Sequence, residues 1–167
     1  MPTEYDIYGP MDVPYESNVK GARLIHKAAA LVTLDNYNAS PERGCYVFGI
    51  RSHGKIRPYY VGKSANSFAA ECFTPDKLVK YNHVLHRVNH GRPVMLFVVP
   101  SNTKGKFNST ALAALEQYLI GLAFQVNEDI QNVQGIPKPL FEIVGVHIPK
   151  KGPKGESLEA FCNAFEL

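Results

Sequence analysis

The pattern of apolar and polar positions predicts a chain in which helices and strands alternate. An irregular arm of residues 1–17 is followed by apolar residues at helical spacing over residues 18–37, which predict an amphipathic helix. Residues 44–50 and 56–62 then alternate as strands do, on either side of a short turn that contains glycine, and predict a β-hairpin. Pro58 has no backbone N–H to donate, so we expect it at a sheet edge or a bulge.

Helices surround one further strand in the rest of the chain. Thr74 followed by proline is a typical helix start, and the apolar run of residues 93–99 has the length of a buried strand. Thr110 begins a long helix whose apolar residues recur every three or four positions. Residues 141–148 and 157–165 predict a last strand and a terminal helix.

Length and composition are those of one globular domain. The chain has 167 residues, of which 45% are hydrophobic. No run approaches the roughly 18 apolar residues of a membrane-spanning helix, so no membrane association is expected. An odd set of widely spaced cysteines argues against a disulfide framework and a zinc knuckle and favours the reducing cytoplasm: Cys45, Cys72 and Cys162.

The charge is distributed unevenly along the chain. The net charge is +3, but residues 43–106 carry eleven lysines and arginines against only two acids, Glu71 and Asp76, which gives +9. The remaining residues carry seven basic and thirteen acidic side chains, which gives −6. A basic segment between acidic ends is typical of a surface that faces a polyanion such as nucleic acid. A solvated surface rich in lysine and arginine would produce the same composition.

Two tyrosine-glycine motifs lie in the predicted hairpin, and a glutamate lies in the last long helix. The first motif is Gly44-Cys45-Tyr46 and the second is Tyr60-Val61-Gly62, so each strand offers one phenol to a shared site. Glu116 lies in an otherwise apolar stretch and precedes a Leu-Ile pair. From residue 44 to about residue 132, the predicted order is strand, strand, helix, strand, helix.

These motifs and their order resemble the GIY-YIG nuclease superfamily over residues 44–132. The resemblance implies an α+β fold with a small three-stranded antiparallel sheet flanked by helices. Residues 1–43 would add an N-terminal helical extension, and residues 133–167 a C-terminal extension. The resemblance also implies metal-dependent endonuclease activity on DNA, with Mg²⁺ or Mn²⁺ held by Glu116 and the water handled by the two motif tyrosines. The motifs do not distinguish DNA from RNA, and target choice is left to loops, termini, homodimerisation or a partner protein.

The superfamily has a phosphate-binding arginine on its first helix, and Ala70 stands at about that position here. A first helix that starts later offers two lysines as the cation: Lys80 for the catalytic group and Lys77 for contact with the nucleic acid. Lys63 follows Tyr60 by three residues, and this spacing predicts that it lowers the pKa of that phenol from its ordinary value near 10.

Further contacts with nucleic acid are expected from His83 and Arg87 on the same helix and from Asn132, because related domains often carry an asparagine near the site. Each residue also has a simpler reading. His83 suits a helix surface, Asn132 suits a turn, and Glu116 suits the polar face of an amphipathic helix. The missing arginine is also what a catalytically silent module would show, one that binds nucleic acid or a partner protein. The sequence leaves both functions open.

Overall fold

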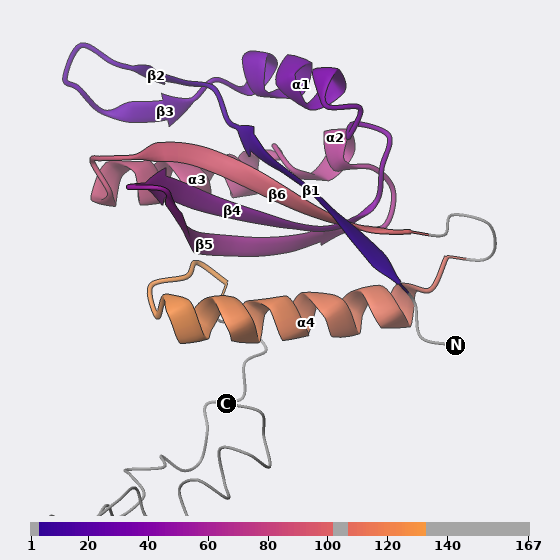
Figure 1. Cartoon of the computed structure of the whole chain (residues 1–167). Coiled ribbons are helices and arrows are strands. Elements are labelled where there is room, and N and C mark those ends of the chain that lie inside the picture. Colours follow the sequence, from indigo (N-terminus) through magenta and orange to yellow (C-terminus); the bar gives the residue numbers. More distant parts are fainter. Residues whose placement is uncertain (1–3, 102–106, 133–167) are drawn as a thin grey trace, which may run out of the picture. The chain divides into compact units, whose positions relative to one another are not determined.

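The computed structural model describes residues 4–101 and 107–132, which belong to one compact unit, Met1–Ile136. Its centre is a four-stranded antiparallel sheet in the order β1 (Tyr5–Asp12), β6 (Arg92–Pro100), β4 (Gly44–Ser52) and β5 (Lys55–Ser64) (Figure 1). The predicted hairpin is confirmed as β4 and β5, and the predicted buried strand as β6. The fold is therefore of the α+β class.

The expected three-stranded sheet is wrong, because a fourth strand, β1, comes from the segment expected to be an irregular arm. Tyr5 to Tyr8 and Met11 to Asp12 pair with β6, and the register shifts between these two stretches. Without β1, the backbone N–H and C=O groups along one side of β6 would lack hydrogen-bond partners. Most side chains of β1 are exposed, so the strand shows no alternating pattern, and its pairing with β6 defines it.

The predicted helix over residues 18–37 is confirmed only in its second half. Helix α1 (Lys27–Asn36) follows a separate two-stranded sheet of β2 (Tyr15–Ser17) and β3 (Arg23–Ile25). The Asn18 side chain accepts hydrogen bonds from two backbone N–H groups and stabilises a turn between β2 and β3 in place of a helical turn. His26 then caps α1 by accepting a hydrogen bond from a backbone N–H of its first turn.

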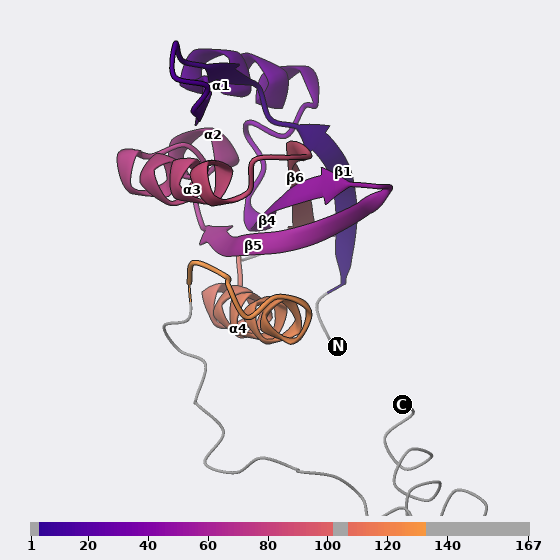
Figure 2. The ribbon, with the colours of Figure 1, turned by 90° about the vertical axis from the view of Figure 1, so that its left-hand side faces the viewer.

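Helices cover both faces of the sheet, as Figures 1 and 2 show. Helices α1, α2 (Phe68–Glu71) and α3 (Pro75–Arg87) lie on one face, and α4 (Ser109–Val126) lies on the other. The helix starts predicted near Thr74 and Thr110 are confirmed, although the side chain of Asn108 caps α4. No helix that the structure describes has the length and apolar character needed to cross a membrane.

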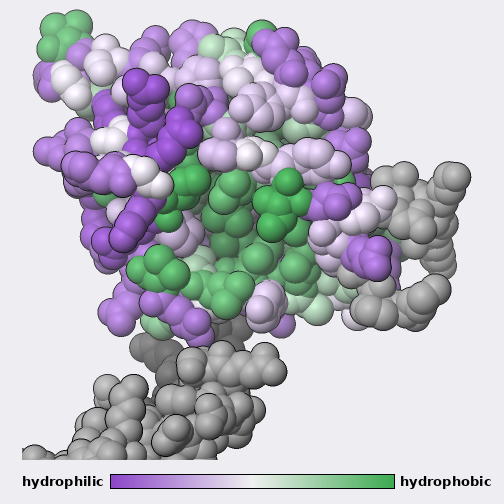
Figure 3. Space-filling model, viewed as in Figure 1, coloured by the Kyte–Doolittle hydropathy of each residue, from purple (hydrophilic) through white to green (hydrophobic). Residues whose placement is uncertain are grey.

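The alternation of side chains along the strands sorts the core into two parts. Tyr46, Phe48 and Tyr60 belong to the aromatic core on the side of α1–α3, whereas Val47 and Val61 pack with α4. Figure 3 shows hydrophobic side chains gathered on the face drawn in Figure 1, between the sheet and α4.

Strand β5 is an edge strand of the sheet, and it has a bulge opposite Phe48 and Gly49. Pro58 lies at this bulge, as its missing N–H predicts. The expected strand 141–148, the expected helix 157–165 and the C-terminal extension 133–167 lie outside the described residues.

Candidate active site at strand β5

Tyr60 lies in β5 on the face that α3 covers, and only 6% of its surface is exposed. The ring of Tyr81 from α3 packs edge-on against it, with 5.8 Å between the ring centroids. The Lys80 ammonium lies over the Tyr60 ring, 5.0 Å from its centroid, which is within the range of a cation–π interaction. Helix α3 thus brings a cation to the phenol of the second motif.

Lys77 is a second cation of α3 at this place, one helical turn before Tyr81. Its side chain is only 14% exposed, and its Nζ lies 2.6 Å from Glu71 Oε1 and 3.3 Å from Asp76 Oδ2. Burial disfavours the charged form of Lys77, but the Glu71 hydrogen bond, the ionised form of Tyr60 and Asp76 outweigh burial and raise the pKa of Lys77. Lys77 is therefore charged at neutral pH.

The pKa of the Tyr60 phenol is raised above its ordinary value of 10. Burial is the largest cause, and Lys77 is the strongest influence that lowers this pKa, while the nearby carboxylates raise it further. The phenol is protonated at neutral pH, so it can both donate and accept a hydrogen bond. Lys77 therefore has the effect on the pKa of Tyr60 that the sequence spacing assigns to Lys63.

Tyr46 of β4 lies against Gly62 of β5 and is completely buried. A Cβ atom added at Gly62 would lie 2.5 Å from the Tyr46 hydroxyl oxygen, so glycine is required for the ring to fit. The centroids of the Tyr46 and Tyr60 rings are 6.2 Å apart, which places the two motif phenols close together. Burial is the largest cause that raises the pKa of Tyr46, and this phenol remains neutral.

The Tyr46 hydroxyl makes no hydrogen bond of standard geometry with any residue that the structure describes. The Tyr81 hydroxyl lies near enough to lower the pKa of Tyr46 slightly, but it donates its own proton to the Cys72 carbonyl at 2.9 Å. A buried hydroxyl of this kind is costly to leave unsatisfied. The Tyr46 phenol is therefore a buried polar group beside Tyr60 that no described residue satisfies.

Glu116 approaches β5 from α4, on the opposite face of the sheet. Lys63 follows Tyr60 by three residues and points to that face because side chains alternate along a strand. Its Nζ lies 2.6 Å from Glu116 Oε2, and the two side chains are 43% and 20% exposed. The Glu116 carboxylate nevertheless raises the pKa of Tyr60, so its charge reaches the phenol across the edge strand. The structure therefore brings the two motif phenols together with Lys80 on one face of β5, and it places Lys63 and Glu116 on the opposite face.

Glu116 is the side chain whose chemistry fits the divalent metal that the motif resemblance implies. Mg²⁺ binds carboxylate oxygens, commonly of one or two side chains, and keeps several waters and substrate phosphate oxygens as its other ligands. Lys63 bonds to Oε2 of Glu116, which leaves Oε1 outside the ion pair. Within residues 4–101 and 107–132, no cluster of three or more histidine, cysteine, aspartate or glutamate side chains is placed to hold a metal.

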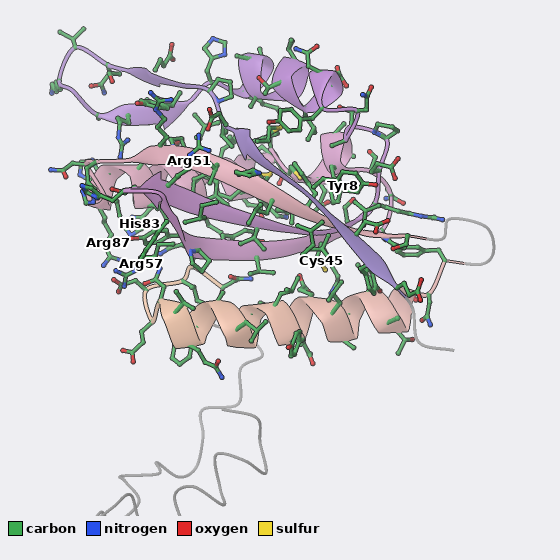
Figure 4. All side chains as sticks on the ribbon, viewed as in Figure 1. Tyr8, Cys45, Arg51, Arg57, His83 and Arg87 are labelled. Atoms are coloured by element: carbon green, nitrogen blue, oxygen red, sulfur yellow. The ribbon has the colours of Figure 1, made fainter. Side chains whose placement is uncertain are left out.

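An exposed basic surface continues along α3 from the Tyr60 site. His83 and Arg87 lie on α3 and Arg57 lies on β5, all three are exposed, and Figure 4 draws them at the same end of the sheet. Arg87 Nη2 lies 3.4 Å from Asp129 Oδ1, and the loop that carries Asp129 is itself bonded to the Pro58 carbonyl. We call Lys80, His83, Arg87 and Arg57 the α3 basic surface.

Asn132 is bound to the edge of β5 through its side-chain amide. Its Oδ1 accepts a hydrogen bond from the Val61 N–H at 3.2 Å, and its Nδ2 donates to the Val61 carbonyl. The Gln131 N–H donates to the Tyr59 carbonyl at 2.7 Å. Residues after α4 therefore satisfy the outer backbone groups of the edge strand. Both ends of the Asn132 amide are engaged there, whereas its expected role is contact with nucleic acid.

Glu71, Asp76 and Tyr81 belong to this site, although the motifs point to none of them. The distribution of charge along the sequence could have pointed to Glu71 and Asp76. They are the only acidic residues of segment 43–106, and both pair with the same lysine, Lys77. The signal for Tyr81 is its spacing of four residues from Lys77, which places both side chains on one face of α3.

No family model, curated protein or solved structure matches this chain. The site itself therefore carries the functional argument. Around one strand it combines two phenols, a carboxylate from α4 and three lysines, two of them from α3. Side chains of these types can bind a phosphate group, hold a divalent cation and orient a water molecule.

Proposed function

We propose that this protein is a metal-dependent endonuclease of the GIY-YIG type that hydrolyses phosphodiester bonds in DNA. One observation supports the proposal most directly. The Lys80 ammonium lies 5.0 Å from the centroid of the Tyr60 ring, and Lys77 lies one helical turn before Tyr81, whose ring packs against Tyr60, although no arginine occurs between Arg57 and Arg87. Phosphate binding requires a cation, and lysine supplies one as a compact point charge.

Lys77 and Lys80 bind the scissile phosphate and neutralise the charge that develops on it. Lys77 is suited to this role because its raised pKa keeps it charged. By the scale of a lost oxyanion donor, removal of one such cation lowers the rate by ~10²–10³-fold. The Tyr60 hydroxyl orients the attacking water, and Tyr46 packs beside Tyr60 as a neutral hydrogen-bond donor.

Glu116 is the metal ligand in this proposal, and Lys63 holds its carboxylate in place at 2.6 Å. A bound Mg²⁺ or Mn²⁺ supplies positive charge at the phosphate oxygens and the departing oxygen. The protein side chains therefore divide the work between the two faces of β5. The α3 lysines and Glu116 lie on opposite faces of β5, so a phosphate must reach around this edge strand to contact both the lysines and a metal held by Glu116.

The α3 basic surface carries the neighbouring phosphates of the nucleic acid. Contacts of this kind do not depend on sequence, and they weaken as the salt concentration rises because bound counterions are released. RNA offers the same phosphates, so it is a second substrate to test. Target choice is assigned to loops, a second copy or a partner protein. The free thiols of Cys45 and Cys72 suit the reducing cytoplasm, which we propose as the location.

The test is cleavage of supercoiled plasmid, linear DNA and RNA with Mg²⁺ or Mn²⁺, comparing the wild type with Glu116→Gln. Glu128→Gln is the matched control, because Glu128 is an exposed glutamate just after α4. We expect metal-dependent cleavage by the wild type and the control and a loss of ~10²-fold or more in Glu116→Gln. Cleavage that continues unchanged in Glu116→Gln would refute the proposed role of the carboxylate.

A catalytically silent nucleic-acid-binding module is the second candidate function. The observation that favours it is that Glu116 and Lys77 are each ion-paired within the protein and that both phenols have raised pKa values. Fluorescence anisotropy with labelled DNA separates the two functions. Salt-sensitive binding by a wild type that cleaves no substrate under any metal condition would favour the silent module.

A further inference from the structure

The acid at the end of α2, Glu71, is attached to a rigid part of the protein. Phe68, the first residue of α2, is completely buried and packs against Phe97, with 4.9 Å between the ring centroids. The Ser67 hydroxyl caps α2 by accepting from the Ala70 N–H at 3.2 Å. The next residue, Cys72, accepts the Tyr81 hydroxyl through its carbonyl. The backbone of Glu71 is thus fixed at both ends, and its carboxylate can hold a partner in one place.

That partner is Lys77, whose side chain is flexible in itself. A lysine side chain loses more conformational entropy than most side chains when it is ordered. The short contact with Glu71 and the low exposure of Lys77 indicate a fixed position. Asp76 also contacts Lys77, but Asp76 is 59% exposed and belongs to α3 itself. Glu71 is therefore the partner that comes from outside the helix, and it holds Lys77 on the face of α3 from which Tyr81 and Lys80 contact the Tyr60 ring.

We propose that Glu71 is a positioning residue that holds the Lys77 ammonium beside the Tyr60 phenol. Together the pair takes over the task of an arginine, whose planar group is pre-organised without such help. The consequence for catalysis rests on the proposed function. The positioning itself does not, and it can be measured in the protein without substrate.

The sign of one pKa change distinguishes positioning from a simple charge effect. Glu71 is negatively charged and on its own raises the pKa of Tyr60, so removing its charge alone would lower that pKa. If Glu71 instead positions Lys77, its removal releases the cation that lowers the Tyr60 pKa most strongly, and the pKa rises. The other titratable groups around Tyr60 are unchanged in a Glu71 variant: Lys80, Tyr46 and Tyr81, which contact its ring, and Asp76 and Glu116, whose charges raise its pKa.

The experiment is an NMR titration of the full chain with ¹³C-labelled tyrosine, in the absence of metal, with Tyr60→Phe to assign the signal. Lys77→Met should lower the acid dissociation constant of Tyr60 roughly tenfold. Glu71→Ala should change it in the same direction. The matched truncation Asp76→Ala should increase it, because it only removes a negative charge. If Glu71→Ala also makes Tyr60 more acidic, the positioning role is overturned.

Two further variants check whether Glu71 acts through Lys77. Glu71→Gln keeps a hydrogen-bond acceptor for Lys77 and should give a Tyr60 pKa below that of Glu71→Ala. It also serves if Glu71→Ala fails to fold. If the wild type cleaves nucleic acid, Glu71→Ala as a single substitution should lower kcat severalfold. The same substitution should have no effect on kcat when Lys77→Met is already present. An unchanged effect of Glu71→Ala in that background would show that Glu71 does not act through Lys77. Absence of cleavage would refute the endonuclease and leave the titration as the decisive result.

Discussion

Replacement of Gly62 by alanine would put a methyl group where the Tyr46 ring lies. The added Cβ would be 2.5 Å from the Tyr46 hydroxyl oxygen and 2.8 Å from Cε2, whereas carbon atoms in contact are normally about 3.5–4.0 Å apart. The ring would have to move by about 1 Å. It has little freedom to do so, because the rings of Phe68 and Tyr60 pack on it with centroids 6.1 and 6.2 Å away.

We expect Gly62→Ala to reduce the free energy of unfolding by about 1–2 kcal/mol. Overpacking of a filled core typically costs about 1–3 kcal/mol. Alanine also restricts the unfolded chain, and this offsets about 0.4–1 kcal/mol. Because the displaced ring packs beside Tyr60, the variant should also reduce any cleavage activity more than its loss of stability would explain.

Urea unfolding followed by circular dichroism measures this change, and Gly121→Ala is the matched control. Gly121 lies in α4, and nothing lies within 4 Å of a Cβ added there. The control should stabilise the protein by up to about 1 kcal/mol, since alanine favours a helix interior over glycine.

The double variant tests the cause. In a Tyr46→Ala background the ring is absent, so Gly62→Ala should no longer destabilise the protein, and the two changes should be strongly non-additive. Equal destabilisation by Gly62→Ala with and without the Tyr46 ring would refute the steric reasoning.

Three more outcomes are expected. Asn132→Ala removes both hydrogen bonds to the Val61 backbone and should reduce the free energy of unfolding by about 1–3 kcal/mol in a urea titration; no change would show that the edge of β5 does not need this amide. Cleavage rates should rise steadily with pH from neutral to about pH 10, because burial raises the pKa of Tyr60 and the deprotonated form of this phenol can also accept a proton from the water that it orients; a plateau near neutral pH would show that deprotonation of Tyr60 does not contribute to cleavage. Arg87→Gln should make the slope of log affinity for DNA against log salt shallower by about 0.9, while the exposed Lys20→Gln on the β2–β3 turn should leave the slope unchanged.

Local pattern was sufficient for the elements that bury one face or both. β4, β5 and β6 carry alternating or continuous apolar residues, and α3 and α4 carry apolar residues at helical spacing. The pairing of Tyr46 with Gly62 follows from the hairpin, because turn and alternation define which residues face each other.

Local pattern failed for elements whose conformation depends on a distant partner. β1 is a strand because β6, more than eighty residues later, needs hydrogen-bond partners. The turn at Asn18 overrides the helical spacing around it, because side-chain hydrogen bonds to the backbone compete with a helix.

The sequence alone determined the hairpin, the buried strand, the main helices and the chemical types of the groups around Tyr60. Tertiary structure decided which of these groups meet. Lys63 is near Tyr60 in the sequence, yet it pairs with Glu116 on the other face, and Lys80 of α3 lies over the Tyr60 ring. The physical reason is that strand alternation and helix packing set the direction of a side chain, whereas distance along the chain does not. An ion pair forms only where two elements bring opposite charges together.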